Sequence, residues 1–242
     1  MHVDVIASVN EARSELFIHK TAIVIDALRA TSTIVTALAH GCSEVIPVET
    51  VCQAQNVQQP GDWLGGERFC KKIAGFDAGN SPYEYMTEEM TDRKVIFTTT
   101  NGTRAIQKSL KAAYILAGAF INATACARAA LHLKKDIILL CSGTQDEFAL
   151  EDGLCAGLLV DRLLQHSDHP SSIQINDLGL AMRSAYLHSA DRLTQTLYDC
   201  AGGRRLSKLG FGKDVEYCAG VDTVPLVPIL TDHQSMKPFL FE

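Results

Sequence analysis

The stretch AIVIDALRATST, residues 22–33, determines the fold class that this sequence predicts. Its first four residues are apolar and mostly β-branched, which is typical of a strand that is buried on both faces of a parallel sheet. Asp26 ends the apolar run, and a segment with helical periodicity follows from Thr31. A buried strand that leads directly into a helix is the first part of a βαβ unit, so the sequence predicts an α/β protein.

The same alternation of strands and helices continues through the first two thirds of the chain. We expect strands at Val3–Ala7, Ala22–Asp26, Glu44–Val48, Val95–Thr99, Tyr114–Ala117 and Asp136–Cys141, and a weaker one at Thr223–Ile229, which contains two prolines. We expect helices at Thr31–His40, Glu49–Gln59, Thr103–Ala112, Ala123–Leu133, Phe148–Gln165 and Leu180–Tyr198. This pattern predicts a mostly parallel sheet covered by helices.

Length and composition limit the classes of protein that need to be considered. The 242 residues fit one large domain or two small ones, and no segment resembles a linker, so we expect a single domain over residues 1–242, with a small subdomain from about residue 202 as an option. The net charge of −6 lacks the basic excess of a nucleic-acid binder. No apolar run reaches the length of a membrane span, so we expect no membrane partner.

The eight cysteines contain no C-x-x-C pair, which argues against a thiolate metal site. The first residues also lack the basic and apolar regions of a secretory signal. We therefore expect a cytoplasmic protein with reduced thiols.

Polar clusters follow three of the expected strands. They occupy residues 26–33, 98–104 and 141–144. Ligands of open α/β sheets bind beyond the carboxyl ends of the strands, so the three clusters should converge on one site. Each cluster also precedes a helix, where backbone N–H groups and hydroxyls can bind phosphate, and Arg29 and Arg104 add positive charge. A simpler interpretation is that the Ser and Thr residues only cap helices.

Several carboxylates could bind a hard cation, which prefers oxygen ligands. Asp26 follows a buried strand, and the further candidates are Glu67, Asp77, Glu151, Asp152 and Asp222. Asp26 could instead cap the next helix, and Glu151 could simply complement a helix dipole.

Some phosphate chemistries are excluded by spacing. Asp26 has no second Asp two residues later, as haloacid-type phosphatases have, and Cys141 has no Arg six residues later, as cysteine phosphatases have. Neither a nucleotide P-loop nor a dinucleotide G-x-G-x-x-G turn is present. Cys141 is more readily interpreted as a small buried residue than as an activated thiolate.

The chain resembles the 2-phosphosulfolactate phosphatase family, also called ComB-like, in five ordered motifs. These are VIDALRATST at residues 24–33, GER at 66–68, GFDAGNSP at 75–82, TTNGTR at 99–104 and ALED at 149–152. The resemblance implies a three-layer α/β/α fold and a Mg²⁺-dependent hydrolysis of 2-phosphosulfolactate to sulfolactate and phosphate. Phe69, Cys70 and Asp146 depart from the glycines of the family pattern, so a related 2-phospho carboxylic acid is an alternative substrate.

The resemblance also implies roles for residues in these motifs. The expected catalytic residues are Asp26, Arg29, Asn101 and Arg104. The expected substrate-binding residues are Thr31, Ser32, Thr33, Arg68, Asn80, Gly102, Thr103, Cys141 and Gly143, with Arg68 assigned to the carboxylate or sulfonate. The expected Mg²⁺ ligands are Asp26, Glu67, Asp77 and Glu151.

Two other functions remain open at this point, a non-catalytic module that binds an acidic metabolite and a phosphotransferase. The expected partner in each case is a small anionic molecule, a phosphate ester for the enzyme. A homo-oligomer is also possible, because the apolar stretch Val224–Leu230 could form a subunit interface, although it could equally form an edge strand.

Overall fold

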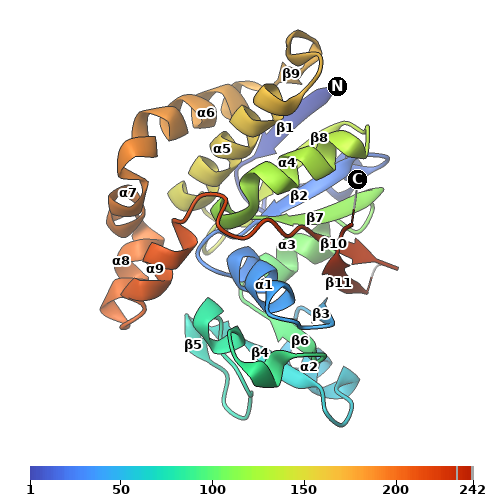
Figure 1. The fold of residues 1–242 in the computed structure, drawn as a ribbon, viewed down its shortest axis with the longest axis vertical. Coiled ribbons are helices and arrows are strands. Elements are labelled where there is room, and N and C mark those ends of the chain that lie inside the picture. The colour runs from blue at the N-terminus through green and yellow to red at the C-terminus, as the bar shows by residue number, and fades with distance from the viewer. Residues whose placement is uncertain (233, 241–242) are drawn as a thin grey trace.

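Eleven strands form one sheet in the computed structural model, which describes residues 1–232 and 234–240 (Figure 1). In spatial order the strands are β5 (Lys71–Lys72), β4 (Trp63–Arg68), β6 (Lys94–Thr98), β3 (Glu44–Pro47), β11 (Ser235–Pro238), β10 (Pro228–Thr231), β7 (Tyr114–Gly118), β2 (Thr21–Ile25), β8 (Ile137–Cys141), β1 (His2–Ile6) and β9 (Gln174–Ile175). Only β5, β10 and β11 run antiparallel to their neighbours. The mostly parallel sheet that the sequence predicts is confirmed.

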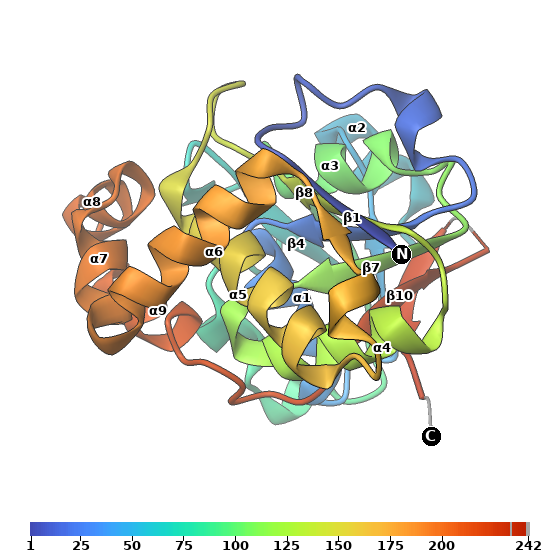
Figure 2. The same ribbon diagram turned by 90° about the horizontal axis from the view of Figure 1, so that it is seen from above.

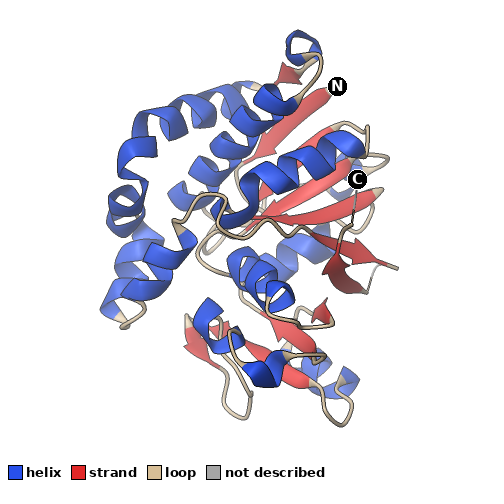
Figure 3. Cartoon of the chain, in the orientation of Figure 1, coloured by secondary structure: helices blue, strands red, loops and turns tan. Residues whose placement is uncertain are grey.

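Nine α-helices accompany the sheet in the described part of the chain (Figure 3). They are α1 (Ala30–Ala39), α2 (Val51–Val57), α3 (Gly102–Lys108), α4 (Ala123–His132), α5 (Leu150–His166), α6 (Asp177–Ser189), α7 (Leu193–Asp199), α8 (Ala201–Lys208) and α9 (Gly212–Cys218). The single helix expected at Leu180–Tyr198 is wrong, because a 3-10 turn at Ala190–Arg192 separates α6 from α7. None of these helices combines enough length with enough apolar character to span a lipid bilayer.

Alternate residues of β2 pack into two hydrophobic clusters. Ile23 and Ile25 lie in a cluster with residues of α4 and α5, whereas Val24 lies in a cluster with Ala105 and Ile106 of α3. This alternation follows from the two-residue period of a β-strand. Figure 2 shows α4, α5 and α6 along one side of the strands and α3 on the other. The three-layer α/β/α fold is therefore confirmed.

The segment between Pro60 and Pro82, where the sequence predicts neither a strand nor a helix, contains two strands, β4 and β5. The sequence does not predict β4 because this strand contains two glycines, and glycine is uncommon in strands. Gly66 has a φ of +136°, and a Cβ atom there would lie 1.9 Å from the carbonyl oxygen of Thr98 on β6. Only glycine permits so close an approach of the two strand ends.

The strand expected at Thr223–Ile229 is also misplaced. Here the backbone N–H of Val224 donates to Ile121, outside any strand, and β10 begins only at Pro228. Pro228 is tolerated as the first residue of β10, because proline cannot donate a hydrogen bond to a neighbouring strand and is therefore confined to such positions. β10 and β11 form a hairpin between β7 and β3, so β10 is an internal strand, and the edge-strand interpretation is wrong.

The segment after Gly202 thus contributes both α8–α9 and an internal hairpin of the sheet. Helices α7, α8 and α9 lie beside the carboxyl ends of β2 and β7 (Figure 1). The proposal of a separate C-terminal subdomain stays a prediction.

Candidate functional site

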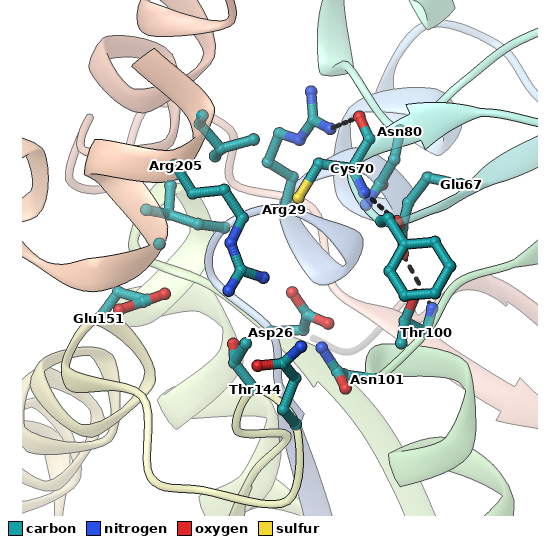
Figure 4. Close-up of a pocket in the computed structure, with 15 residues that line it drawn as sticks. Asp26, Arg29, Glu67, Cys70, Asn80, Thr100, Asn101, Thr144, Glu151 and Arg205 are labelled. Carbon is teal, nitrogen blue, oxygen red and sulfur yellow. Dashed lines mark hydrogen bonds between the residues drawn. The ribbon is translucent and has the colours of Figure 1, made fainter. Parts of the chain in front are cut away.

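A pocket lies at the carboxyl ends of β2, β4, β6 and β8, and α5 and α8 complete its wall (Figure 4). Its lining residues are Asp26, Leu28, Arg29, Glu67, Phe69, Cys70, Asn80, Thr100, Asn101, Thr144, Gln145, Glu151, Gly202, Arg205 and Leu206. Each of the three polar clusters that follow strands contributes to this pocket. β2 and β8 are parallel neighbours, whereas β4 and β6 belong to a second parallel group on the other side of the β10–β11 hairpin, so the packing of the two groups brings the clusters together.

Asp26 lies at the bottom of the pocket, in the turn between β2 and α1. Its Oδ1 accepts a hydrogen bond of 3.1 Å from the backbone N–H of Ala30, at the first residue of α1. The hydroxyl of Thr31 bonds to the backbone N–H and carbonyl of Asp26 and so holds the turn. Burial, together with the negative charges of Glu67 and Glu151, raises the pKa of Asp26 to about 6.

Glu67 connects the end of β4 to the loop that follows β6. Its Oε1 accepts a hydrogen bond of 2.8 Å from the backbone N–H of Thr100, and its Oε2 accepts one of 2.6 Å from Cys70. The side chain is therefore fixed at the pocket wall and is only 7% exposed.

Glu151 is the second residue of α5, and it is buried against α8. A Cβ atom at Gly202 would lie 2.1 Å from its Oε1, so α8 can approach this carboxylate only because residue 202 is glycine. Asp26, Glu67 and Glu151 thus place three carboxylates around one pocket.

Oxygen ligands of this kind suit Mg²⁺, which commonly keeps several waters. No three His, Cys, Asp or Glu side chains in the described ranges are close enough together to hold one metal ion. A cation here would need water among its ligands. Asp77 does not line the pocket; its carboxylate accepts a hydrogen bond of 2.8 Å from the backbone N–H of Leu64.

Arg29 lines the pocket, but its guanidinium is engaged elsewhere. Its Nη1 lies 2.5 Å from Oδ2 of Asp214, and both side chains are almost fully buried. Its Nη2 donates to the carbonyl of Cys70, and the group stacks 4.4 Å from the ring centre of Phe211. In Figure 4 this guanidinium points away from Asp26.

The other two predicted arginines do not line the pocket. Arg68 donates to the carbonyls of Glu67 and Glu49 and to the hydroxyl of Thr98. Arg104 forms an exposed ion pair of 2.6 Å with Asp146. The roles expected for both residues stay predictions.

The predicted substrate-binding residues divide in the same way. Of these, Asn80 lines the pocket, as does Asn101, which was expected among the catalytic residues. The remaining ones lie behind its surface, and they are Thr31, Ser32, Thr33, Gly102, Thr103, Cys141 and Gly143. The hydroxyls of Ser32 and Thr33 donate to backbone carbonyls. Burial, more than the nearby negative charges, raises the pKa of the Cys141 thiol well above its usual range.

Asp152 has a larger structural role than its sequence position indicated. Its carboxylate accepts hydrogen bonds from the backbone N–H groups of Ala27 and Gly143 and from the hydroxyl of Ser142. Burial raises its pKa, and the charges of Asp26 and Glu151 add to the shift. Asp152 therefore holds the ends of β2 and β8 together beside the pocket.

Sequence reasoning missed two charged residues of this region, Asp214 and Arg205. Asp214, on α9, is the partner of Arg29, and Arg205, on α8, lines the pocket. No local signal distinguishes Arg205 from its neighbour Arg204, because both lie in a short polar helix.

Comparisons with known proteins agree with the motifs. The model of a family described as 2-phosphosulpholactate phosphatase matches residues 6–233. A relative from Clostridium novyi is 40% identical over 231 residues, which cover 94% of this chain and 96% of the relative. One from Thermotoga petrophila is 42% identical over 216 residues, or 88% and 90% of the two chains. Both are named "Probable 2-phosphosulfolactate phosphatase". Because the match extends over nearly the whole chain, the protein belongs to the 2-phosphosulfolactate phosphatase family.

Proposed function

We propose that this protein is a Mg²⁺-dependent phosphatase that hydrolyses 2-phosphosulfolactate, or a related 2-phospho carboxylic acid, to the 2-hydroxy acid and phosphate. The observation that carries this proposal is the set of three carboxylates, Asp26, Glu67 and Glu151, around one pocket that also contains Arg205. The names of the relatives support the choice of substrate.

Asp26, Glu67 and Glu151 would hold the Mg²⁺ ion mainly through its bound waters, because no three such side chains of the described residues are close enough to ligate one ion together. The raised pKa of Asp26 supports this assignment, because burial and like charges disfavour its ionised form and a cation would offset that cost. Bound Mg²⁺ would neutralise charge on the phosphoryl oxygens.

Asp26 also has the properties of the group that orients the attacking water. Its Oδ1 is held by the N–H of Ala30, and its Oδ2 faces the start of α3, where a Cβ atom on Gly102 would lie only 2.8 Å away. A pKa of about 6 leaves most of the carboxylate ionised at neutral pH, while making it a stronger base than an ordinary Asp.

In the proposed reaction the water oxygen forms a bond to phosphorus and gives up a proton to Asp26. The bond between phosphorus and the C2 oxygen of the substrate breaks, and that oxygen takes up a proton from solvent water to become the hydroxyl of the product, while Asp26 returns its proton to solvent. The side-chain amide of Asn101, on the wall opposite α8, would donate to the phosphate.

Phosphate release in ¹⁸O-labelled water tests this function. We expect release from 2-phosphosulfolactate and 2-phospholactate that requires Mg²⁺, is abolished by EDTA, and incorporates one ¹⁸O atom per phosphate released. Transfer to an added alcohol without ¹⁸O in phosphate would identify a phosphotransferase. Binding of the esters without any turnover would identify a non-catalytic module.

A further inference from the structure

The proposed substrate has an acidic group next to its phosphate, and the pocket needs a cation to bind it. Arg29 does not supply this cation, because Asp214 and the carbonyl of Cys70 bind its guanidinium. Arg68 and Arg104 lie outside the lining, where Thr98 and Asp146 bind them. Three of the four arginines near the site are therefore already engaged by the protein.

Arg205 differs from these three. It lines the pocket, and Figure 4 shows its guanidinium directed into the space between Asp26 and Glu151. Within the described residues it forms no ion pair with a carboxylate, since none lies within 4.0 Å of its charged nitrogens. Its positive charge and a hydrogen bond to the thiol lower the pKa of Cys70, against the larger effect of burial.

The helix that carries Arg205 is firmly placed. Leu206 is buried in the main hydrophobic cluster, and the thiol of Cys200 caps α8 by accepting a hydrogen bond from the N–H of Gly203. Gly202 packs directly against the carboxylate of Glu151. The Cα of Arg205 is thus fixed relative to the carboxylates of the pocket, while its guanidinium remains available for a ligand.

We propose that Arg205 binds the acidic group, a carboxylate or a sulfonate, that stands next to the phosphate of the substrate. This inference rests on the proposed function. Arg205 is on the α8 side of Asp26, whereas Thr100, Asn101 and Glu67 are on the opposite side (Figure 4). A phosphate held by Asn101 therefore leaves its neighbouring acidic group facing Arg205, whose planar fork suits two oxygen atoms.

The test compares kcat/KM for three esters, namely 2-phosphosulfolactate, 2-phospholactate and a neutral alkyl phosphate. We expect Arg205→Ala to lower the values for the two acidic esters by roughly ten- to a hundredfold, because their charged group loses its partner. The neutral ester should change by less than about threefold, because it makes no such contact. Arg205→Lys should recover part of the loss, since it keeps the charge without the fork.

Arg204→Ala is the matched control, because Arg204 is the adjacent residue of α8 and its guanidinium donates to the carbonyl of Asp199 instead of lining the pocket. Arg204→Ala should leave kcat/KM unchanged for all three esters. An equal loss for all three esters in Arg205→Ala would show that Arg205 binds the phosphate, and no loss would overturn the proposal. If Arg68→Ala abolished the preference instead, the role would belong to Arg68.

A binding measurement separates this inference from the proposed function. Calorimetry with sulfolactate and lactate, which cannot be hydrolysed, should give a Kd that rises roughly tenfold or more in Arg205→Ala. If the unmodified protein hydrolysed none of the esters but showed this dependence, the phosphatase proposal would fail and the role of Arg205 would stand. If the unmodified protein hydrolysed the esters but Arg205→Ala left sulfolactate binding unchanged, the phosphatase proposal would stand and the proposed role of Arg205 would fail.

Discussion

Arg29 and Asp214 form a buried ion pair that joins two segments 185 positions apart in the chain, with 2.5 Å between Nη1 and Oδ2. Ser81 donates a second hydrogen bond, of 2.9 Å, to Oδ1 of Asp214. The pair fastens α9 to the turn that follows β2, next to Asp26. Its position makes it a structural support of the pocket wall.

Removing Asp214 should therefore destabilise the protein strongly. We expect Asp214→Ala to lower the free energy of unfolding by about 3–5 kcal/mol, because Arg29 would be left buried without its partner. Urea unfolding measures this change. The matched control is Asp146→Ala, which breaks the exposed pair with Arg104 and should cost no more than about 1 kcal/mol. Similar costs for both variants would contradict the structural role of the buried pair.

Asp26→Asn should separate activity from stability. The raised pKa of Asp26 shows that folding disfavours its ionised form, so the variant should be at least as stable as the unmodified protein at neutral pH. Turnover with Mg²⁺ should fall by roughly 10²–10⁴-fold if Asp26 acts as the base. Steady-state kinetics and urea unfolding check the two parts.

The control for this substitution is Asp136→Asn, since Asp136 accepts a hydrogen bond from His2 at the far end of the neighbouring strands. It should retain normal turnover. Near-normal activity in a well-folded Asp26→Asn protein would remove Asp26 from the catalytic group.

Glu44 should make the stability depend on pH in the acidic range. Burial alone would raise its pKa, but hydrogen bonds from Lys94, Ser235 and Lys237 lower it from 4.5 to about 2. Because the folded-state pKa is below the unfolded one, this stabilisation is present above pH 4.5 and is lost as the pH falls toward 2.

The variant Glu44→Gln should thus be less stable than the unmodified protein at pH 7, and the difference should narrow by about pH 3. Thermal unfolding at several pH values measures it. A difference that stays constant between these two pH values would show that the charge of Glu44 makes no contribution.

Cys141→Ser should retain most of the activity. Cys141 is fully buried at the end of β8, and its raised pKa keeps the thiol protonated and unreactive. Alkylation followed by peptide mass mapping should modify the exposed Cys52 first and leave Cys141 intact. A phosphocysteine trapped at residue 141 would contradict the proposed attack by water.

The sequence by itself determined the α/β class, because apolar β-branched runs such as residues 22–25 alternate with helical periods. It also identified part of the site, since Asp26, Asn101 and Thr144 each follow the carboxyl end of an expected strand and line the pocket. It did not show β4, in which Gly66 allows a close contact with Thr98 on β6. That contact joins distant parts of the chain and leaves no local pattern.

The tertiary structure alone decided which arginine faces the pocket. Arg29 follows a strand, as expected of a ligand-binding residue, but Asp214 on the distant helix α9 binds its guanidinium. Arg205 has no strand beside it in the sequence and reaches the pocket only because α8 packs against Glu151. The physical reason is that local sequence sets where a backbone segment begins and ends, whereas the direction of a long charged side chain depends on partners supplied by remote segments.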